Sequence, residues 1–303
     1  MAERAASRRR MPLGAGAVVG LGLLLVFALA AALADWVAPY SYTQQNVANA
    51  RRAPSAANLL GTDELGRDVL SRLIHGGRVS LSVAVVAQVL ILLVGVPIGA
   101  AAGYFGGWVD GLVSRVMEVL FSFPDLLLII VIVSSLRAAF SVEAAGGALV
   151  GLAAFDAAIG GLLGVFVSLA LVSWLTVARI VRAQVASLKQ REFVEAARAS
   201  GATDSRVVAR HLLPAVWPAV FVAATVGIPR VIVVEASLSF IGLGVQPPFP
   251  SWGAMILAGS NALRAGYPHL ILAPAGALVL TVLACTLVGD SLGERRSQRR
   301  AGT

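Results

Sequence analysis

The sequence predicts an all-α integral membrane protein with six transmembrane helices and with both termini on the cytoplasmic side (N-in/C-in). The first observation is composition: the 303 residues are 58% hydrophobic and 13% charged, with a mean hydropathy of +0.83. An ordinary soluble domain has about 25% charged residues, so a water-soluble fold of this composition could not cover its surface with polar groups. The second observation is a series of long charge-free runs, and the third is the gathering of arginines on one side of them.

Six apolar runs are long enough to cross a bilayer, which needs about 20 apolar residues. Five contain no Asp, Glu, Lys or Arg, and one carries only Asp125 near its start. The runs are continuous, whereas membrane β-strands give short alternating segments. We therefore expect spans at 11–34, 79–109, 119–136, 157–178, 211–229 and 265–289.

Two apolar segments allow a second interpretation. Residues 144–155 are rich in Gly and Ala and too short to span, so we expect an external loop or a re-entrant turn. The first run follows Arg8–Arg10 and precedes Ala32-Leu33-Ala34, which resembles a secretory signal peptide. Its 24 apolar residues exceed the usual signal core and five spans follow, so an uncleaved first helix is preferred.

The positions of the arginines indicate the orientation, because cytoplasmic loops carry an excess of Lys and Arg. With the N-terminus, the loop between the fourth and fifth spans and the C-terminus inside, the inner segments hold 15 basic and six acidic residues. The rest of the chain is then close to neutral, so the isoelectric point near 10.9 indicates orientation rather than nucleic-acid binding. The basic residues are Arg4, Arg8, Arg9, Arg10, Arg179, Arg182, Lys189, Arg191, Arg198, Arg206, Arg210, Arg295, Arg296, Arg299 and Arg300.

The basic loop after the fourth span has the pattern of two short helices joined by a glycine. Residues 192–200 include strong helix formers, and Gly201 stands where a left-handed C-cap is wanted. Thr203 or Asp204 can cap a second helix. This helix either ends at Pro214, or Pro214 opens the next span. Small alanines and arginines would allow a protein partner to approach, although a plain solvated connector is the alternative.

The spacing of this loop resembles the EAA loop of bacterial ABC importer permeases, EAA-x3-G-x9-I-x-LP. The chain reads Glu195-Ala196-Ala197, Gly201 and His211-Leu212-Leu213-Pro214. It departs from the pattern in having histidine for isoleucine, which is associated with the peptide-transport branch. The resemblance implies that this coupling loop (about 187–214) docks onto a cytoplasmic ATPase. The coupling residues it implies are Glu195, Ala196, Ala197, Arg198, Gly201, Asp204, His211 and Pro214.

Two further stretches resemble the dipeptide, oligopeptide and nickel subfamily. Residues 59–81 match GTD-x-x-GRD-x-x-SR, and we expect Thr62 or Asp63 to cap an amphipathic helix at the membrane surface. Residues 235–256, "EASLSFIGLGVQPPFPSWGAMI", are expected to include an irregular external loop. The resemblance, which covers about residues 59–290, implies the type I ABC importer permease fold. We divide the chain into an N-terminal part (1–78) and a five-helix permease core (79–303).

No catalytic motif is found in the sequence. A P-loop requires the lysine of G-x-x-x-x-G-K-[ST], and the only lysine, Lys189, lies between Leu188 and Gln190. The three histidines do not form H-E-x-x-H, and the single cysteine allows no Cys-based metal site. We expect no catalytic residue, no metal and no cofactor on this chain, with ATP and Mg²⁺ on partner ATPase subunits.

Arg230 and Glu235 are charged residues near the outer end of the fifth span. They could line the substrate path and meet a peptide, because charges within spans often mark such paths. The alternative, which we favour, is that they lie at the outer interface, extending to water or contacting a partner subunit. Asp125 is expected to be structural.

Together these features imply a multi-pass permease of the bacterial inner membrane that imports di- or oligopeptides by alternating access. The implied partners are a homologous permease forming a heterodimer, two cytoplasmic ATPases, an extracytoplasmic substrate-binding protein and membrane lipid, without nucleic acid. Nickel, haem or glutathione-like cargo is the alternative within this class. A proton-coupled secondary transporter is the alternative from another class, although we find no internal repeat of broken helices.

Overall fold

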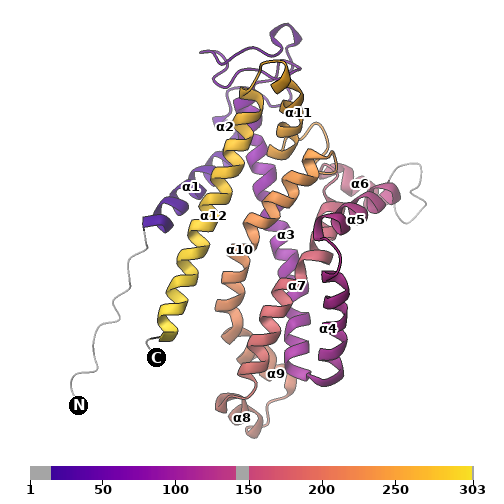
Figure 1. The fold of residues 1–303 in the computed structure, drawn as a ribbon, viewed down its shortest axis with the longest axis vertical. Helices are drawn as coiled ribbons and strands as arrows, with labels where there is room; N and C mark the ends of the chain where they lie inside the picture. Colours follow the sequence, from indigo (N-terminus) through magenta and orange to yellow (C-terminus); the bar gives the residue numbers. More distant parts are fainter. Residues whose placement is uncertain (1–14, 141–149, 302–303) are drawn as a thin grey trace, which may run out of the picture.

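The computed structural model describes residues 15–140 and 150–301, with side chains as far as Ser291. Within these ranges the fold is helical, and the sole β pairing is an isolated bridge between Thr62 and Asp68. Figure 1 shows an elongated bundle with small helices at both ends. Its elements are α1 (Ala15–Ala32), α2 (Ala34–Val37), η1 (Val47–Asn49), α3 (Val69–Phe105), α4 (Gly107–Phe121), α5 (Asp125–Phe140), α6 (Val150–Ala158), α7 (Leu163–Leu188), α8 (Glu192–Ala199), α9 (Asp204–Val207), the π-helical η3 (Val208–Leu212), α10 (Leu213–Phe240), α11 (Trp252–Arg264) and α12 (His269–Ala301).

Five helical runs in the described residues are long and apolar enough to cross a membrane, and a bent pair brings the number to six. This confirms the predicted all-α membrane class. The third span, expected at 119–136, is broken inside that range: α4 ends at Phe121, and α5 begins at Asp125 after a bend of 91°. The cause is Pro124, which has no backbone N–H and disfavours helical geometry at the residue before it.

Helix α3 begins at Val69, ten residues before the predicted second span. The predicted surface helix capped by Thr62 or Asp63 is therefore wrong, because residues 69–81 form the first turns of the membrane helix itself. Asp68 is the N-cap, and its side chain accepts a hydrogen bond from Ser71 N at 2.8 Å. The helix crosses residues 78 and 79 without a break, where we had divided the chain.

The fifth span also starts earlier than predicted. The run from α9 through η3 to α10 is continuous from Asp204 to Phe240. Pro214, which has no backbone N–H to donate, directly follows the π-helical η3 in this run. The second helix of the loop is thus the beginning of the span rather than a separate unit.

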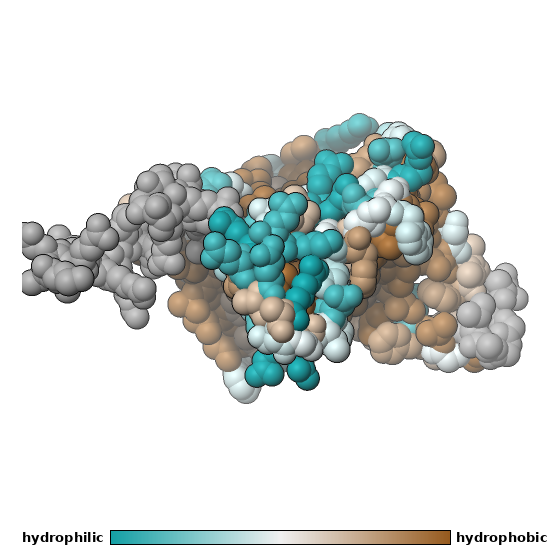
Figure 2. Space-filling view, turned by 90° about the horizontal axis from the view of Figure 1, so that it is seen from below, coloured by the Kyte–Doolittle hydropathy of each residue, from teal (hydrophilic) through white to brown (hydrophobic). Residues whose placement is uncertain are grey.

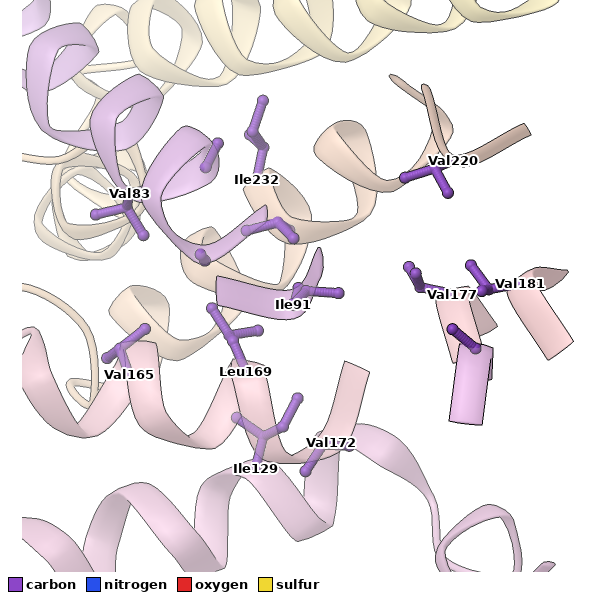
Figure 3. Close-up of a cluster of buried hydrophobic side chains, with 14 of the residues drawn as sticks. Val83, Ile91, Ile129, Val165, Leu169, Val172, Val177, Val181, Val220 and Ile232 are labelled. Atoms are coloured by element: carbon purple, nitrogen blue, oxygen red, sulfur yellow. The ribbon is translucent and has the colours of Figure 1, made fainter. Parts of the chain in front are cut away.

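The core lies where α3, α7 and α10 meet, and Figure 3 shows Ile91, Leu169 and Ile232, which these three helices contribute to one buried cluster. Helix α3 packs most extensively on α7. A stripe of three glycines on α3, at 95, 99 and 103, allows this contact. A Cβ on Gly99 would lie 2.4 Å from Ala178 O, so the two backbones touch. Small residues permit such close helix packing in membranes.

The remaining helices surround this core. Helix α1 runs along α12, where Gly20 faces the carbonyl of Ala284, and α11 packs on the outer part of α12. Of the segment 144–155, residues 144–149 lie outside the described residues. The rest forms α6, which at nine residues is too short to cross a bilayer.

Candidate functional site

The coupling loop has the local structure that its sequence predicts. Helix α8 ends at Ala199, and Gly201 follows with φ +80°, the left-handed conformation that glycine adopts without a Cβ clash. Thr203 is the N-cap residue of α9. The predicted helix–glycine–helix arrangement is confirmed.

The loop forms one end of the molecule and exposes mostly polar groups. Figure 2 looks onto this end and shows hydrophilic side chains gathered at the front, with hydrophobic helix surfaces behind them. Glu195, Ala196 and Arg198 are exposed, whereas Val194 is completely buried and Ala197 packs against the core. Phe193 adds an apolar side chain that is 42% exposed. The loop thus presents a small mixed surface fixed from beneath by Val194.

The other predicted loop residues take different positions. Gly201, Asp204 and Pro214 are exposed, and His211 is half-buried in the π-helical turn. A π-turn inside a helix is frequently found at functional sites. Among the described residues, no three His, Cys, Asp or Glu side chains meet as metal ligands would.

Tyr104, in the last turn of α3, fastens the loop to the bundle. Its hydroxyl donates to Asp204 Oδ1 at 2.5 Å and accepts from Arg198 Nη2 at 3.1 Å. Lys189 Nζ donates to its backbone carbonyl at 2.5 Å. The hydrogen bond to Tyr104 raises the pKa of Arg198. We call these four residues the Tyr104 cluster.

A cavity of about 330 Å³ lies between α3, α7 and α10. Its wall is apolar except for a few polar side chains. These are Gln88 from α3, Ser173 and Thr176 from α7, and Arg230 from α10. Such a mixture of apolar walls and few polar groups is typical of small-molecule sites.

Arg230 lines this cavity and forms an ion pair with Asp125 at the start of α5. About half of the Arg230 side chain is exposed, and Asp125 itself is not part of the cavity wall. Asp125 therefore ties the bent α4–α5 pair to α10. Arg230 keeps its place as a candidate for the substrate path.

Glu235 is completely buried and does not line this cavity. Ser239 Oγ donates to Glu235 Oε1 at 2.8 Å and Ser80 Oγ to Oε2 at 3.2 Å. Ser251 Oγ donates to Ser239 at 3.2 Å, and Trp252 N donates to Ser80 at 3.3 Å. These five residues, the Glu235 network, join α3, α10 and α11. Both expectations for Glu235, on the substrate path and at the outer interface, are therefore wrong.

Replacing Glu235 by alanine is expected to lower the free energy of unfolding by about 2 kcal/mol, because two buried hydroxyl groups lose their acceptor. The midpoint of thermal unfolding, followed in the detergent-purified protein, should fall by roughly 5 °C. Ser237→Ala is the matched control, since Ser237 Oγ bonds only to Val233 O of its own helix. Equal midpoints for the two variants would contradict this role for Glu235.

The GTD-x-x-GRD-x-x-SR stretch and the loop after α10 meet at the end of the molecule opposite the coupling loop. Trp252, 1% exposed, donates from Nε1 to Leu73 O at 3.0 Å. Asp63 accepts from the backbone and side chain of Arg67 at 2.9 and 2.7 Å. Asp35 receives hydrogen bonds from Arg78 and from His75, and these lower its pKa. The two sequence motifs thus form one clamp around the start of α3.

The comparisons with known proteins agree with this geometry. Residues 95–301 match the family model described as "binding-protein-dependent transport system inner membrane component". The chain belongs to this family. Residues 15–54 of the permease also match the model for the N-terminal transmembrane domain of oligopeptide transport permease C. The predicted recognition as an ABC importer permease is confirmed, and the protein is a multi-pass inner membrane protein.

Several curated relatives are similar over nearly the whole permease. The oligopeptide transport system permease protein of Escherichia coli (strain K12) is 38% identical over 94% of this chain and 88% of its own length. The dipeptide transport system permease protein of Bacillus subtilis (strain 168) is 36% identical over 94% and 82%. A glutathione transport system permease protein of Pectobacterium atrosepticum is 36% identical over 90% and 83%.

A solved structure shows the same fold. The MetNI methionine ABC transporter, in inward-facing conformations, matches with a TM-score of 0.52 and 21% identity. The match covers 72% of the permease and 93% of that chain. It supports the type I permease arrangement of helices.

Sequence reasoning missed three kinds of functional candidate. Phe193 and Lys189 in the coupling loop were passed over, as was Tyr104 at the end of a span. The cavity residues Gln88 and Thr176 were also missed. Gln88 did carry a signal, because it is a polar side chain inside a long apolar run.

Proposed function

We propose that this permease subunit imports di- or oligopeptides and that its coupling loop docks onto a cytoplasmic ATPase. The observation that carries the proposal is the exposed surface of α8. It presents Glu195, Ala196 and Arg198 beside the left-handed Gly201, at the end of the molecule where the chain has its positive charge. The names of the relatives, two of them peptide permeases, support the cargo class.

The assembly would contain a homologous permease as a heterodimer partner, two ATPases and an extracytoplasmic binding protein. ATP and Mg²⁺ would bind the ATPases, because this chain has a single lysine that does not lie in a P-loop. We place the coupling loop and both termini in the cytoplasm. The positive-inside distribution supports this N-in/C-in orientation, as does the common lower position of α8 and the end of α12 in Figure 1.

The mechanism would be alternating access around the cavity between α3, α7 and α10. Movement of the ATPases would displace α8, and the continuous run from Asp204 to Phe240 would transmit that displacement to α10. Gln88 and Thr176 offer hydrogen-bonding groups to peptide backbones as they pass. The apolar walls would accept side chains of varied shape.

The test is reconstitution of the permease in proteoliposomes with its partner permease, ATPases and binding protein. We expect ATP-dependent uptake of labelled di- and oligopeptides, and none when the ATPases are left out. Uptake of nickel, haem or glutathione in place of peptides would identify the alternative cargo. Peptide uptake by the permease alone, driven by a proton gradient, would contradict the proposal and favour a secondary transporter.

Arg230→Gln is expected to raise the KM for peptide uptake about threefold to tenfold, because the cavity loses the guanidinium that can meet a peptide carboxylate. The rate of ATP hydrolysis without peptide should not change. Arg115→Gln is the control, since Arg115 is 80% exposed on α4 and pairs only with Glu118. An unchanged KM for Arg230→Gln would remove Arg230 from the substrate path.

A further inference from the structure

We propose that Tyr104 is a positioning residue that ties the coupling loop to the wall of the cavity. The inference rests on the proposed function and goes beyond it, because Tyr104 is buried and lies outside the loop that would dock onto the ATPase. Its side chain is 3% exposed at the inner end of α3. It would set how far α3 follows the loop when the loop moves.

Three separate segments converge on this one residue. Lys189 follows the last residue of α7, Arg198 lies on α8, and Asp204 is the first residue of α9. Lys189 and Arg198 also approach the face of the tyrosine ring, at 5.5 and 5.4 Å from its centroid. A tyrosine is suited to this position, because its hydroxyl can donate to Asp204 and accept from Arg198 at the same time.

Both residues of the Tyr104–Asp204 hydrogen bond belong to helical runs that line the cavity. Gln88 and Ile91 line the cavity from the same helix as Tyr104, 16 and 13 residues away, or about 24 and 20 Å along α3. Asp204 begins the run that supplies Val226, Gly227 and Arg230 to the opposite wall. The Tyr104–Asp204 hydrogen bond therefore joins the inner ends of two cavity walls.

Helix α7, which forms the remaining wall of the cavity, is expected to move together with α3. Helix α7 is packed against α3 through the glycine stripe, where a Cβ on Gly103 would lie 2.5 Å from Arg182 O. Arg182 Nη2 in turn donates to Asp110 Oδ2 of α4 at 2.7 Å. The inner ends of α3, α4 and α7 thus form one rigid unit, and the coupling loop is attached to this unit through the Tyr104 cluster. For a movement of the loop to open the cavity toward this end, the hydrogen bonds of the Tyr104 cluster must stay intact during the movement.

The experiment compares Tyr104→Phe with Phe105→Leu in the complete reconstituted transporter, measuring peptide uptake and ATP hydrolysis on the same vesicles. Tyr104→Phe keeps the ring and removes only the hydroxyl, whereas Phe105 is 59% exposed beside it. We expect Tyr104→Phe to lower the peptide carried per ATP hydrolysed about threefold to tenfold. Co-purification of the ATPases and the KM for peptide should stay unchanged. Phe105→Leu should leave the ratio intact.

A second variant separates positioning from a folding defect. Asp204→Asn keeps Tyr104 but removes the negative charge of the group that accepts its hydroxyl hydrogen bond, so it should also lower the peptide carried per ATP hydrolysed. The double variant, Tyr104→Phe with Asp204→Asn, should lower this ratio no further than Tyr104→Phe alone. An unchanged ratio, or a parallel loss of uptake, hydrolysis and ATPase co-purification in both variants, would overturn the proposal. If the unmodified assembly carries no peptide at all, the proposed function fails instead, which is a distinguishable outcome.

Discussion

Replacing Glu195 by arginine is expected to abolish ATP-driven uptake, with a loss greater than about tenfold, while the permease still inserts into the membrane. Glu195 is exposed on α8, where its carboxylate interacts electrostatically with the nearby Arg198, so the change acts mainly on the surface of the loop. Reversed charge on a protein interface costs several kcal/mol of association through like-charge contacts and lost pairing. The measurement is co-purification of the ATPases with the tagged permease, followed by uptake.

Glu64→Arg provides the control for this prediction. It makes the same charge change on an exposed side chain in the outer loop, where Glu64 pairs with Arg51. Surface ion pairs contribute little, so this variant should keep both ATPase binding and uptake. Gly201→Asp should reproduce the Glu195→Arg phenotype, because it adds a Cβ at φ +80° and a negative charge. Normal ATPase co-purification by both loop variants would remove the coupling role from this segment.

Replacing Gly99 by leucine is expected to prevent the helix bundle from forming. A leucine side chain at this position would meet the Ala178 backbone, which cannot rotate away, so α3 and α7 must separate. Overpacking in a core costs about 1–3 kcal/mol when side chains can yield, and here the opposing atoms are backbone, so we expect about 3 kcal/mol or more. The measurement is the amount of monodisperse permease recovered after detergent extraction, judged by size-exclusion chromatography.

Gly276→Leu is the matched substitution for Gly99→Leu. Gly276 lies inside α12, another long helix, and a Cβ there meets nothing within 4 Å. The recovered amount should be close to that of the unmodified permease. If Gly99→Leu is recovered equally well, the backbone contact between α3 and α7 does not hold the bundle together.

The sequence allowed the spans to be predicted but not their ends. Charge-free runs stop at Arg78, whereas α3 begins at Val69, because Arg72 and His75 are buried inside the helix against partners that precede it. Asp63 pairs with Arg72, and Asp35 with His75. Only the tertiary structure supplies these partners, so a charge count ends the helix too early. The bend before Asp125 was different, since Pro124 was visible in the sequence.

The candidate site likewise has one part that the sequence predicts and one part that it does not. The loop could be predicted, because Gly201 and the residues around it act over a few positions of the chain. The cavity could not, because Gln88, Thr176 and Arg230 are brought together by the packing of three helices. Glu235 shows the limit most clearly: a charge in an apolar span suggested a transport path, yet its hydroxyl partners come from α3 and from its own helix.

The length of α3 has a mechanical consequence. A helix of 37 residues is about 55 Å long, and here its first turns are held by the clamp around Trp252 while its last turn carries Tyr104. It can therefore act as a lever that pivots at its N-terminal end. A tilt of roughly 10° would displace Tyr104 by about 10 Å, and Gln88, about halfway along, by about 5 Å. The displacement at the cavity would therefore be about half the displacement at the loop, and the force acting at the cavity would be about twice the force applied at the loop.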